Sequence, residues 1–151
     1  MPAVRARVAV LLAALWWGSL SGLAFVVVPL LFKHLGSPAE AGAMAAKLFS
    51  AQTWLSVACA MLLLLLLNAK KPDGASAPNS ATAWVVAGLL LALLVEFGVS
   101  AQIVSARASG GNLRLWHGLG SAMLLGQWLC AGLALWRLSL FMPGQAKAQR
   151  S

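Results

Sequence analysis

Glu96 is the residue of this 151-residue chain whose chemistry fits its surroundings least. It lies in an apolar stretch, residues 82–107, that is long enough to cross a bilayer as a helix. About ten residues, or ~15 Å, separate it from the end of that stretch, which places the carboxyl group near the bilayer midplane. A charge there costs at least about 2.5 to 3.5 kcal/mol, so the side chain should face other helices. It is either a carboxylate that binds a cation or relays protons, or a neutral acid hydrogen-bonded between helices.

Other polar side chains fall at a similar depth in their own apolar stretches and could form a polar layer around Glu96. They are Ser19, Ser21, Ser56 and Gln127, and Gln52 shares one helix face with Ser56. Ser100 and Glu96 also continue a stripe of small residues that recurs every four positions from Gly88, as close helix contact requires. Because such residues also join helices without any further role, a purely structural layer is the alternative.

The two histidines, His34 and His117, are expected at the same end of the molecule, with Arg114 beside the second. Imidazole nitrogen ligates both haem iron and copper, so a bis-histidine site is one hypothesis for this outer face. Two histidines make a sparse copper site, however, and no Met or Cys lies at ligand spacing. We predict no metal site and no cofactor, and we keep haem or copper as the alternative.

The sequence carries no motif of a known catalytic mechanism. It has no phosphate-binding loop, no Ser-His-Asp arrangement, no metalloprotease helix and no paired carboxylates. With three acidic residues in total, a hydrolase would have few groups for acid and base catalysis. We therefore predict no catalytic residues and a protein that is not an enzyme.

The composition indicates an integral membrane protein. Hydrophobic residues make up 61% of the chain and charged residues 9%, against roughly 25% charged in a soluble domain. The net charge of +8 comes from Lys and Arg scattered between apolar blocks, which is not the clustered patch of a nucleic-acid binder. Lipid is thus the expected environment, and no nucleic-acid partner is expected.

Four apolar stretches alternate with short polar breaks, which predicts an all-α, up-down four-helix bundle in one membrane domain, 1–151. The expected helices are about 8–32, 38–67, 82–107 and 115–136, with a flexible cytoplasmic loop at 68–81 and a polar tail at 143–151. Pro29 can kink the first helix or end it early, because proline lacks the backbone donor. The second helix should begin at Pro38, after the capping residue Ser37.

Basic residues set the expected orientation, because Lys and Arg near the spans are retained in the cytoplasm. One side carries Arg5, Arg7, Lys70, Lys71, Arg137, Lys147 and Arg150, and the other carries Lys33, Lys47, Arg107 and Arg114. Seven against four predicts that both termini are cytoplasmic. We expect a multi-pass protein of the cell inner (plasma) membrane.

Two helices carry stripes of small residues at four-residue spacing. The stripes are Gly18 and Gly22 in the first helix, and Gly118, Ala122 and Gly126 in the fourth. Small residues let helix backbones approach closely, so these stripes predict contact between the first and fourth helices. Homo-oligomer formation, or contact with another membrane protein, is the alternative use.

Several short motifs occur in an order that resembles the transmembrane protein 205-like family, also catalogued as domain of unknown function 4149. They are Trp17-Gly18, Pro29-Leu30-Leu31-Phe32, Lys47-Leu48-Phe49 and Arg114-Leu115-Trp116-His117-Gly118. The resemblance covers roughly residues 8 to 136 and implies a compact four-helix membrane protein, with no established reaction to transfer. His117-Gly118 matches that family's pattern best, although Gly120 and then Ser121 follow where related chains often have an earlier hydroxyl. A more distant similarity in architecture links the chain to copper-resistance and haem-linked membrane proteins.

Together these observations favour a non-enzymatic membrane protein that acts in transport or as an accessory component, with an intramembrane polar site around Glu96. Two alternatives belong to other classes. One is a haem- or copper-binding protein that uses His34 and His117, and the other is a structural subunit whose helix stripes bind another membrane protein.

Overall fold

The computed structural model describes residues 2–68 and 79–140, and these form four long helices. The elements are α1 (Pro2–Gly22), the π-helical turn η1 (Leu23–Val27), α2 (Val28–His34), α3 (Pro38–Asn68), α4 (Asn79–Leu94), the π-helical turn η2 (Val95–Val99), α5 (Ser100–Ser109) and α6 (Leu113–Leu140). α1, η1 and α2 are continuous and make the first span, and α4, η2 and α5 make the third. Each span has 28 to 32 residues, or about 42 to 48 Å, enough to cross a bilayer with its headgroup layers. The expected all-α, four-helix membrane bundle is confirmed.

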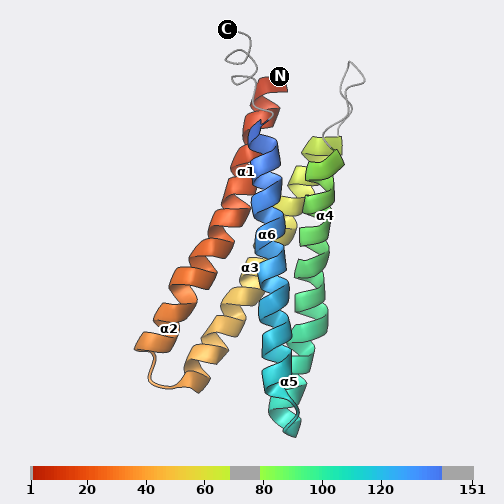
Figure 1. The fold of residues 1–151 in the computed structure, drawn as a ribbon. Coiled ribbons are helices and arrows are strands. Elements are labelled where there is room, and N and C mark those ends of the chain that lie inside the picture. Colours follow the sequence, from red (N-terminus) through yellow and green to blue (C-terminus); the bar gives the residue numbers. More distant parts are fainter. Residues whose placement is uncertain (1, 69–78, 141–151) are drawn as a thin grey trace.

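The four spans run up and down, and they pack unevenly along their length (Figure 1). At the upper end of the view, α1, α4 and α6 lie close to one another, and α3 crosses behind α6 to reach α4. Toward the lower end, α2 and the beginning of α3 stay paired but diverge from α5 and the beginning of α6. The bundle is therefore closed in one half and open in the other.

The helix ends follow local sequence signals, although the spans extend further than expected, over 2–34, 38–68, 79–109 and 113–140. α3 begins at Pro38 as expected, and the Ser37 hydroxyl caps it by accepting the Glu40 N–H at 3.2 Å. α5 ends at Ser109 and is followed by Gly110, whose φ of 75° is a left-handed conformation that glycine adopts without strain. The first helix begins at Pro2, ahead of the apolar stretch, and Arg5 donates to the Leu66 carbonyl near the end of α3. The expected polar tail and residues 69–78 of the expected flexible loop lie outside the described residues. Residues 68 and 79–81, which were expected in that loop, belong to helices α3 and α4.

Pro29 neither ends nor breaks the first span. The helix widens into η1 just before it, where the Val28 N–H bonds to the Leu23 carbonyl five residues back, and it then continues to His34. Pro29 occupies one of the first two positions of α2, where a missing N–H is tolerated. The π-helical turn thus accommodates the proline, and the span reaches its full length.

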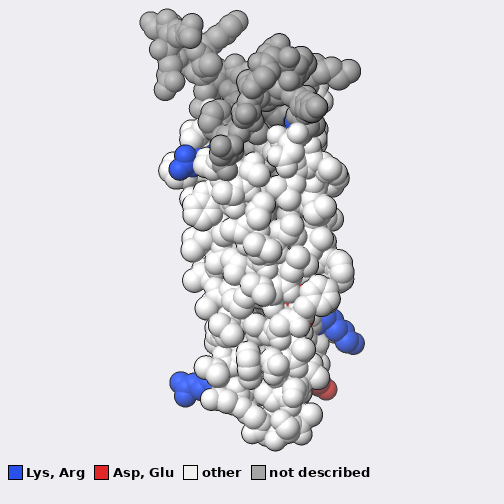
Figure 2. All heavy atoms as spheres, turned by 90° about the vertical axis from the view of Figure 1, so that its right-hand side faces the viewer, with Lys and Arg blue, Asp and Glu red and all other residues white. Residues whose placement is uncertain are grey.

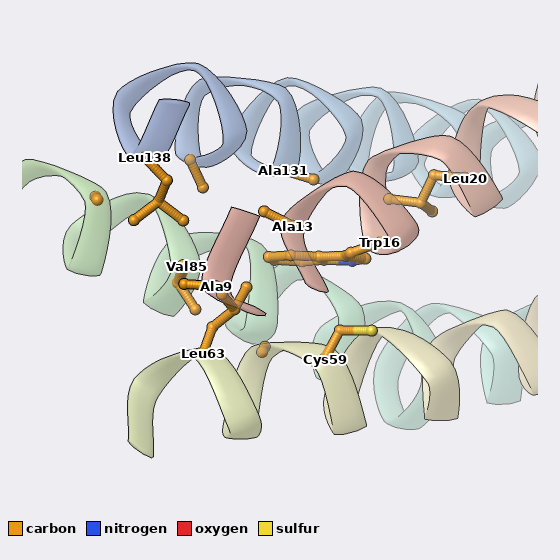
Figure 3. Close-up of a cluster of buried hydrophobic side chains, with 12 residues drawn as sticks. Ala9, Ala13, Trp16, Leu20, Cys59, Leu63, Val85, Ala131 and Leu138 are labelled. Atoms are coloured by element: carbon orange, nitrogen blue, oxygen red, sulfur yellow. The ribbon is translucent and has the colours of Figure 1, made fainter. Parts of the chain in front are cut away.

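The closed half of the bundle holds the hydrophobic core (Figure 3). Its centre is Trp16, whose side chain is fully buried among small residues of all four spans, including Ala13, Cys59 and Ala131. A Cβ built on Gly88 would lie 2.7 Å from the Trp16 ring, so only glycine leaves room for the indole there. A single large side chain is thus accommodated by small ones on its neighbours.

The outer surface of the bundle is apolar, as a lipid-facing surface must be. Large hydrophobic side chains such as Leu11, Phe25, Leu65, Leu90 and Leu129 are exposed on every span. On the face seen in Figure 2, Lys and Arg occur near the upper end and in the lower part, and the long stretch between them carries neither. This distribution supports a multi-pass membrane protein.

A candidate intramembrane ligand site

The open half of the bundle contains a cleft of about 830 Å³ between the α2–α3 pair and the α5–α6 pair. Its lining is mostly apolar, with Ala24, Phe49, Val95, Val99, Ile103 and Leu124 among its residues. Several lining side chains, such as Phe25 and Val104, are also exposed on the outer surface. The cleft is therefore accessible from the side that faces lipid.

The two ends of the cleft differ chemically. Its inner end, near the middle of the spans, is lined by Ser50, Glu96 and Gln127, and its mouth, near the helix ends, is lined by Arg107 and His117. Eleven residues separate Glu96 from Arg107 along the third span, or about 16 Å at the helical rise. This length is close to half the thickness of a bilayer's hydrocarbon core, so the cleft extends through roughly one leaflet.

Glu96 lies in η2 and is half-buried. Its Oε1 accepts a 2.6 Å hydrogen bond from the hydroxyl of Ser50 on α3. Beside this bond, Trp54 and Phe97 make an edge-to-face contact with ring centroids 6.5 Å apart, and both rings are exposed. The carboxyl group is thus held between two helices at the cleft wall, with aromatic rings on the neighbouring surface.

Gln52 and Ser56 form a second buried polar group, and Gln52 also lines the cleft. The Gln52 amide donates to the hydroxyls of Ser19 at 3.0 Å and Ser56 at 3.3 Å, and Ser56 donates to the Gln52 carbonyl at 2.8 Å. Ser56 is fully buried, and Gln52 is 8% exposed. These bonds join α1 to α3 and satisfy most of the polar groups involved, which is the structural role such residues often have in membranes.

Ser21 belongs to a third arrangement rather than to the surroundings of Glu96. Its hydroxyl accepts the Trp128 indole N–H at 2.8 Å and donates to the Trp17 carbonyl at 2.8 Å. Trp128 also stacks against Trp17 and contacts the edge of Phe25. The polar layer expected from depth alone is therefore divided among separate hydrogen-bonded groups.

Gln127 differs from the other candidates because its hydrogen bonding is incomplete. The side chain lines the inner end of the cleft and is 3% exposed, and within the described part of the chain its Nε2 has no hydrogen-bond partner. Leaving a buried amide donor unpaired costs about 1 to 3 kcal/mol. An amide held in this state beside a cavity is a candidate for binding a ligand.

Ser100 also lines the cleft, one residue after η2. The wider π-helical turn shifts the helical phase, so Val99 at its end and Ala106 beyond it are buried and Ser100 is exposed. The four-residue stripe that begins at Gly88 therefore does not continue as a packing surface past Glu96. Both π-helical turns contribute to the cleft wall, as such turns often do at functional sites.

The outer-face candidates differ in their relation to the cleft. His117 lines the mouth of the cleft, whereas His34 and Arg114 are exposed and are not part of its lining. Among the described residues, no three His, Cys, Asp or Glu side chains come together as metal ligands would. The bis-histidine hypothesis for haem or copper stays an alternative, because it needs two ligands rather than three.

We expected the stripes of small residues to pack the first helix against the fourth, but most of their residues do not contact a neighbouring helix. A Cβ built on Gly18, Gly22 or Gly118 would meet nothing within 4 Å, and Ala122 is exposed. Of these stripe positions, only Gly126 is close to a neighbour, with Leu91 at 3.2 Å. The first and fourth spans are adjacent, but Gly132 makes that contact by accommodating the Trp17 ring at 2.9 Å. The unused stripes face outward.

Two site residues were missed at the sequence level, Ser50 and Arg107. Ser50 lies 12 residues after the start of α3, and Glu96 lies 13 residues before the end of α5. The start of α3 and the end of α5 lie at the same end of the bundle, so counting residues from these ends could have paired Ser50 with Glu96. Arg107 was counted only for its charge. Its place in the cleft depends on how far α5 and α3 separate, which the sequence pattern does not show.

Comparison with known proteins identifies the family and nothing closer. A family model described as "Domain of unknown function (DUF4149)" matches residues 11–112, about two thirds of the chain. Neither the curated proteins nor the solved structures that were searched contain a match. The four-span chain with its one-leaflet cleft belongs to the DUF4149 family.

Proposed function

We propose that this protein binds a cationic molecule with a large apolar body in the cleft, and that it acts in transport or as an accessory component of the membrane. The observation that carries the proposal is the Glu96 carboxyl group at the inner end of an apolar cavity. Acidic side chains at this depth are rare and are enriched at ion and substrate pathways. We also propose that the protein resembles the transmembrane protein 205-like family. We place it in the inner membrane with both termini in the cytoplasm.

The chemistry of the lining selects the ligand. Apart from Glu96, the side chains around the inner end are neutral, including Val95, Gln127 and Leu124. A carboxylate in such surroundings attracts a cation more strongly than it would in water, because the low local dielectric screens the two charges less. The apolar walls favour an organic cation over a hydrated metal ion, since the latter requires several oxygen ligands.

Binding of tetraphenylphosphonium to detergent-purified protein tests this proposal. We expect Glu96→Gln to raise the Kd at least about tenfold, which corresponds to ~1.4 kcal/mol. The matched control is Glu40→Gln, the same change at an exposed residue outside the cleft lining, and it should leave the Kd unchanged. Triphenylphosphine oxide, an uncharged probe of similar shape, should bind more weakly and should not distinguish the variants. Equal Kd values for the two variants would show that Glu96 does not select the ligand.

A second measurement separates transport from binding. Proteoliposomes loaded with DNA would report entry of the cation ethidium as a rise in fluorescence. Transport predicts entry faster than in protein-free liposomes and slowed by Glu96→Gln but not by Glu40→Gln. Binding without faster entry would assign the protein an accessory role.

A further inference from the structure

We propose that the mouth of the cleft is a binding site for a phospholipid with an anionic headgroup, whose phosphate is held by Arg107 and whose acyl chain lies in the outer part of the cleft. Its phosphate contact is separate from Glu96 and does not depend on the proposed cation binding. An acyl chain that spans one leaflet extends toward Glu96, so the lipid and the cation occupy the same cleft in turn. The phosphate group that Arg107 binds belongs to a lipid of the surrounding membrane.

Arg107 has the position that such a site needs. It is two residues from the end of α5, and its Nη2 reaches across the cleft mouth to within 3.7 Å of the place that a Cβ on Gly42 of α3 would occupy. The midpoint of the third span is Leu94, 13 residues or about 20 Å away, so the guanidinium lies at headgroup level when the span is centred in the bilayer. Within the described part of the chain, this guanidinium has no hydrogen-bond or ion-pair partner.

The charge around the mouth is complementary to an anionic headgroup. The other exposed basic residues near this end of the bundle are Lys33, Lys47 and Arg114. Glu40 is the acidic residue that the structure describes at the same end, and it is also exposed. Guanidinium binds phosphate in a bidentate geometry, and juxtamembrane basic residues attract anionic lipids by about 1 kcal/mol each.

The cleft below Arg107 suits an acyl chain. Ala45, Ala46 and Ile103 line it, and no acidic side chain intervenes between Arg107 and Glu96 along the lining. Small residues on α3 leave the space, and exposed lining residues such as Val104 leave it open to the bilayer. A lipid in the surrounding leaflet can therefore place its headgroup at Arg107 and one chain in the cleft without leaving its own depth.

Native mass spectrometry of detergent-purified protein tests the site, with phosphatidylglycerol and phosphatidylcholine as probes. We expect one retained phosphatidylglycerol that phosphatidylcholine does not replace. Arg107→Ala should weaken retention about five- to tenfold, and Arg114→Ala, which removes an exposed arginine outside the lining, should weaken it clearly less. Equal effects of the two variants, or equal retention of the two lipids, would overturn the proposal.

The chain position is tested separately. Ala46→Phe fills the cleft mouth and should abolish retention, whereas Ala43→Phe, on an exposed position of α3 outside the lining, should leave it intact. Both variants must keep the wild-type helical content and elution volume. Inorganic phosphate in large excess should not displace the lipid, and displacement would show a soluble anion site instead. Glu96→Gln should leave lipid retention unchanged, so failure of either proposal can be recognised without the other.

Discussion

The hydroxyl of Ser50 donates a 2.6 Å hydrogen bond to the Glu96 carboxyl group, and this bond joins α3 to η2 at the inner end of the cleft. It is the one side-chain hydrogen bond among the described residues that connects the second and third spans. A carboxyl group that binds a cation must be held in place by partners that do not cancel its negative charge. One hydroxyl donor meets that requirement better than a basic side chain would.

The Ser50–Glu96 bond should make a measurable but modest contribution to stability. A double-mutant cycle with Ser50→Ala and Glu96→Ala, followed by denaturant unfolding in detergent micelles, should give a coupling free energy of about 0.5 to 1.5 kcal/mol. Interhelical hydrogen bonds in membranes rarely exceed that range, because the unfolded helices find other partners. A coupling near zero would mean that the bond does not persist in the folded protein.

Gly88 should tolerate substitution much less than Gly18. The Cβ of Gly88→Ala would lie 2.7 Å from the buried Trp16 ring, so we expect a loss of about 1 to 3 kcal/mol in the free energy of unfolding. Gly18→Ala adds its methyl group where nothing lies within 4 Å and should be neutral or slightly stabilising. Thermal unfolding of the two variants compares them directly. Similar losses would show that Gly18 does pack against a partner, such as a second copy of the chain.

Gln127→Leu should separate ligand binding from folding. Removing an unpaired buried amide should leave the free energy of unfolding unchanged or raise it, because no hydrogen bond of Nε2 is lost. The same substitution should weaken tetraphenylphosphonium binding if the amide contacts the ligand. The two measurements are unfolding in detergent and the Kd, and a large loss of stability would indicate that the amide has a structural partner.

We predict the orientation of the chain from its basic residues, and protein fusions can test it. A fluorescent protein that matures only in the cytoplasm should be bright when attached to the C-terminus, and alkaline phosphatase at the same place should be inactive. The Gly110-Gly111 turn supplies the opposite control, since a phosphatase inserted there should be active. Activity of the C-terminal phosphatase would reverse the orientation and place the cleft mouth on the cytoplasmic side.

The sequence alone determined that the protein lies in lipid and that it has four membrane-spanning helices. Apolar stretches longer than 20 residues can satisfy their backbone hydrogen bonds in lipid only as helices, so the four-helix membrane fold followed from composition and spacing. It also selected Glu96, because one acidic residue in a long apolar stretch is energetically costly wherever its partners lie. These inferences need only local information about hydrophobicity and charge.

Tertiary structure decided which residues meet. The π-helical turn at η2 shifts the phase of the third span and changes which side of α5 faces the bundle, so the stripe from Gly88 and the polar layer could not be extended from a constant period. Trp16 and Trp17 are accommodated by Gly88 and Gly132, whereas the regular stripe at Gly18 faces outward. The divergence that creates the cleft depends on contacts between residues far apart in the chain, which a pattern along one helix does not contain.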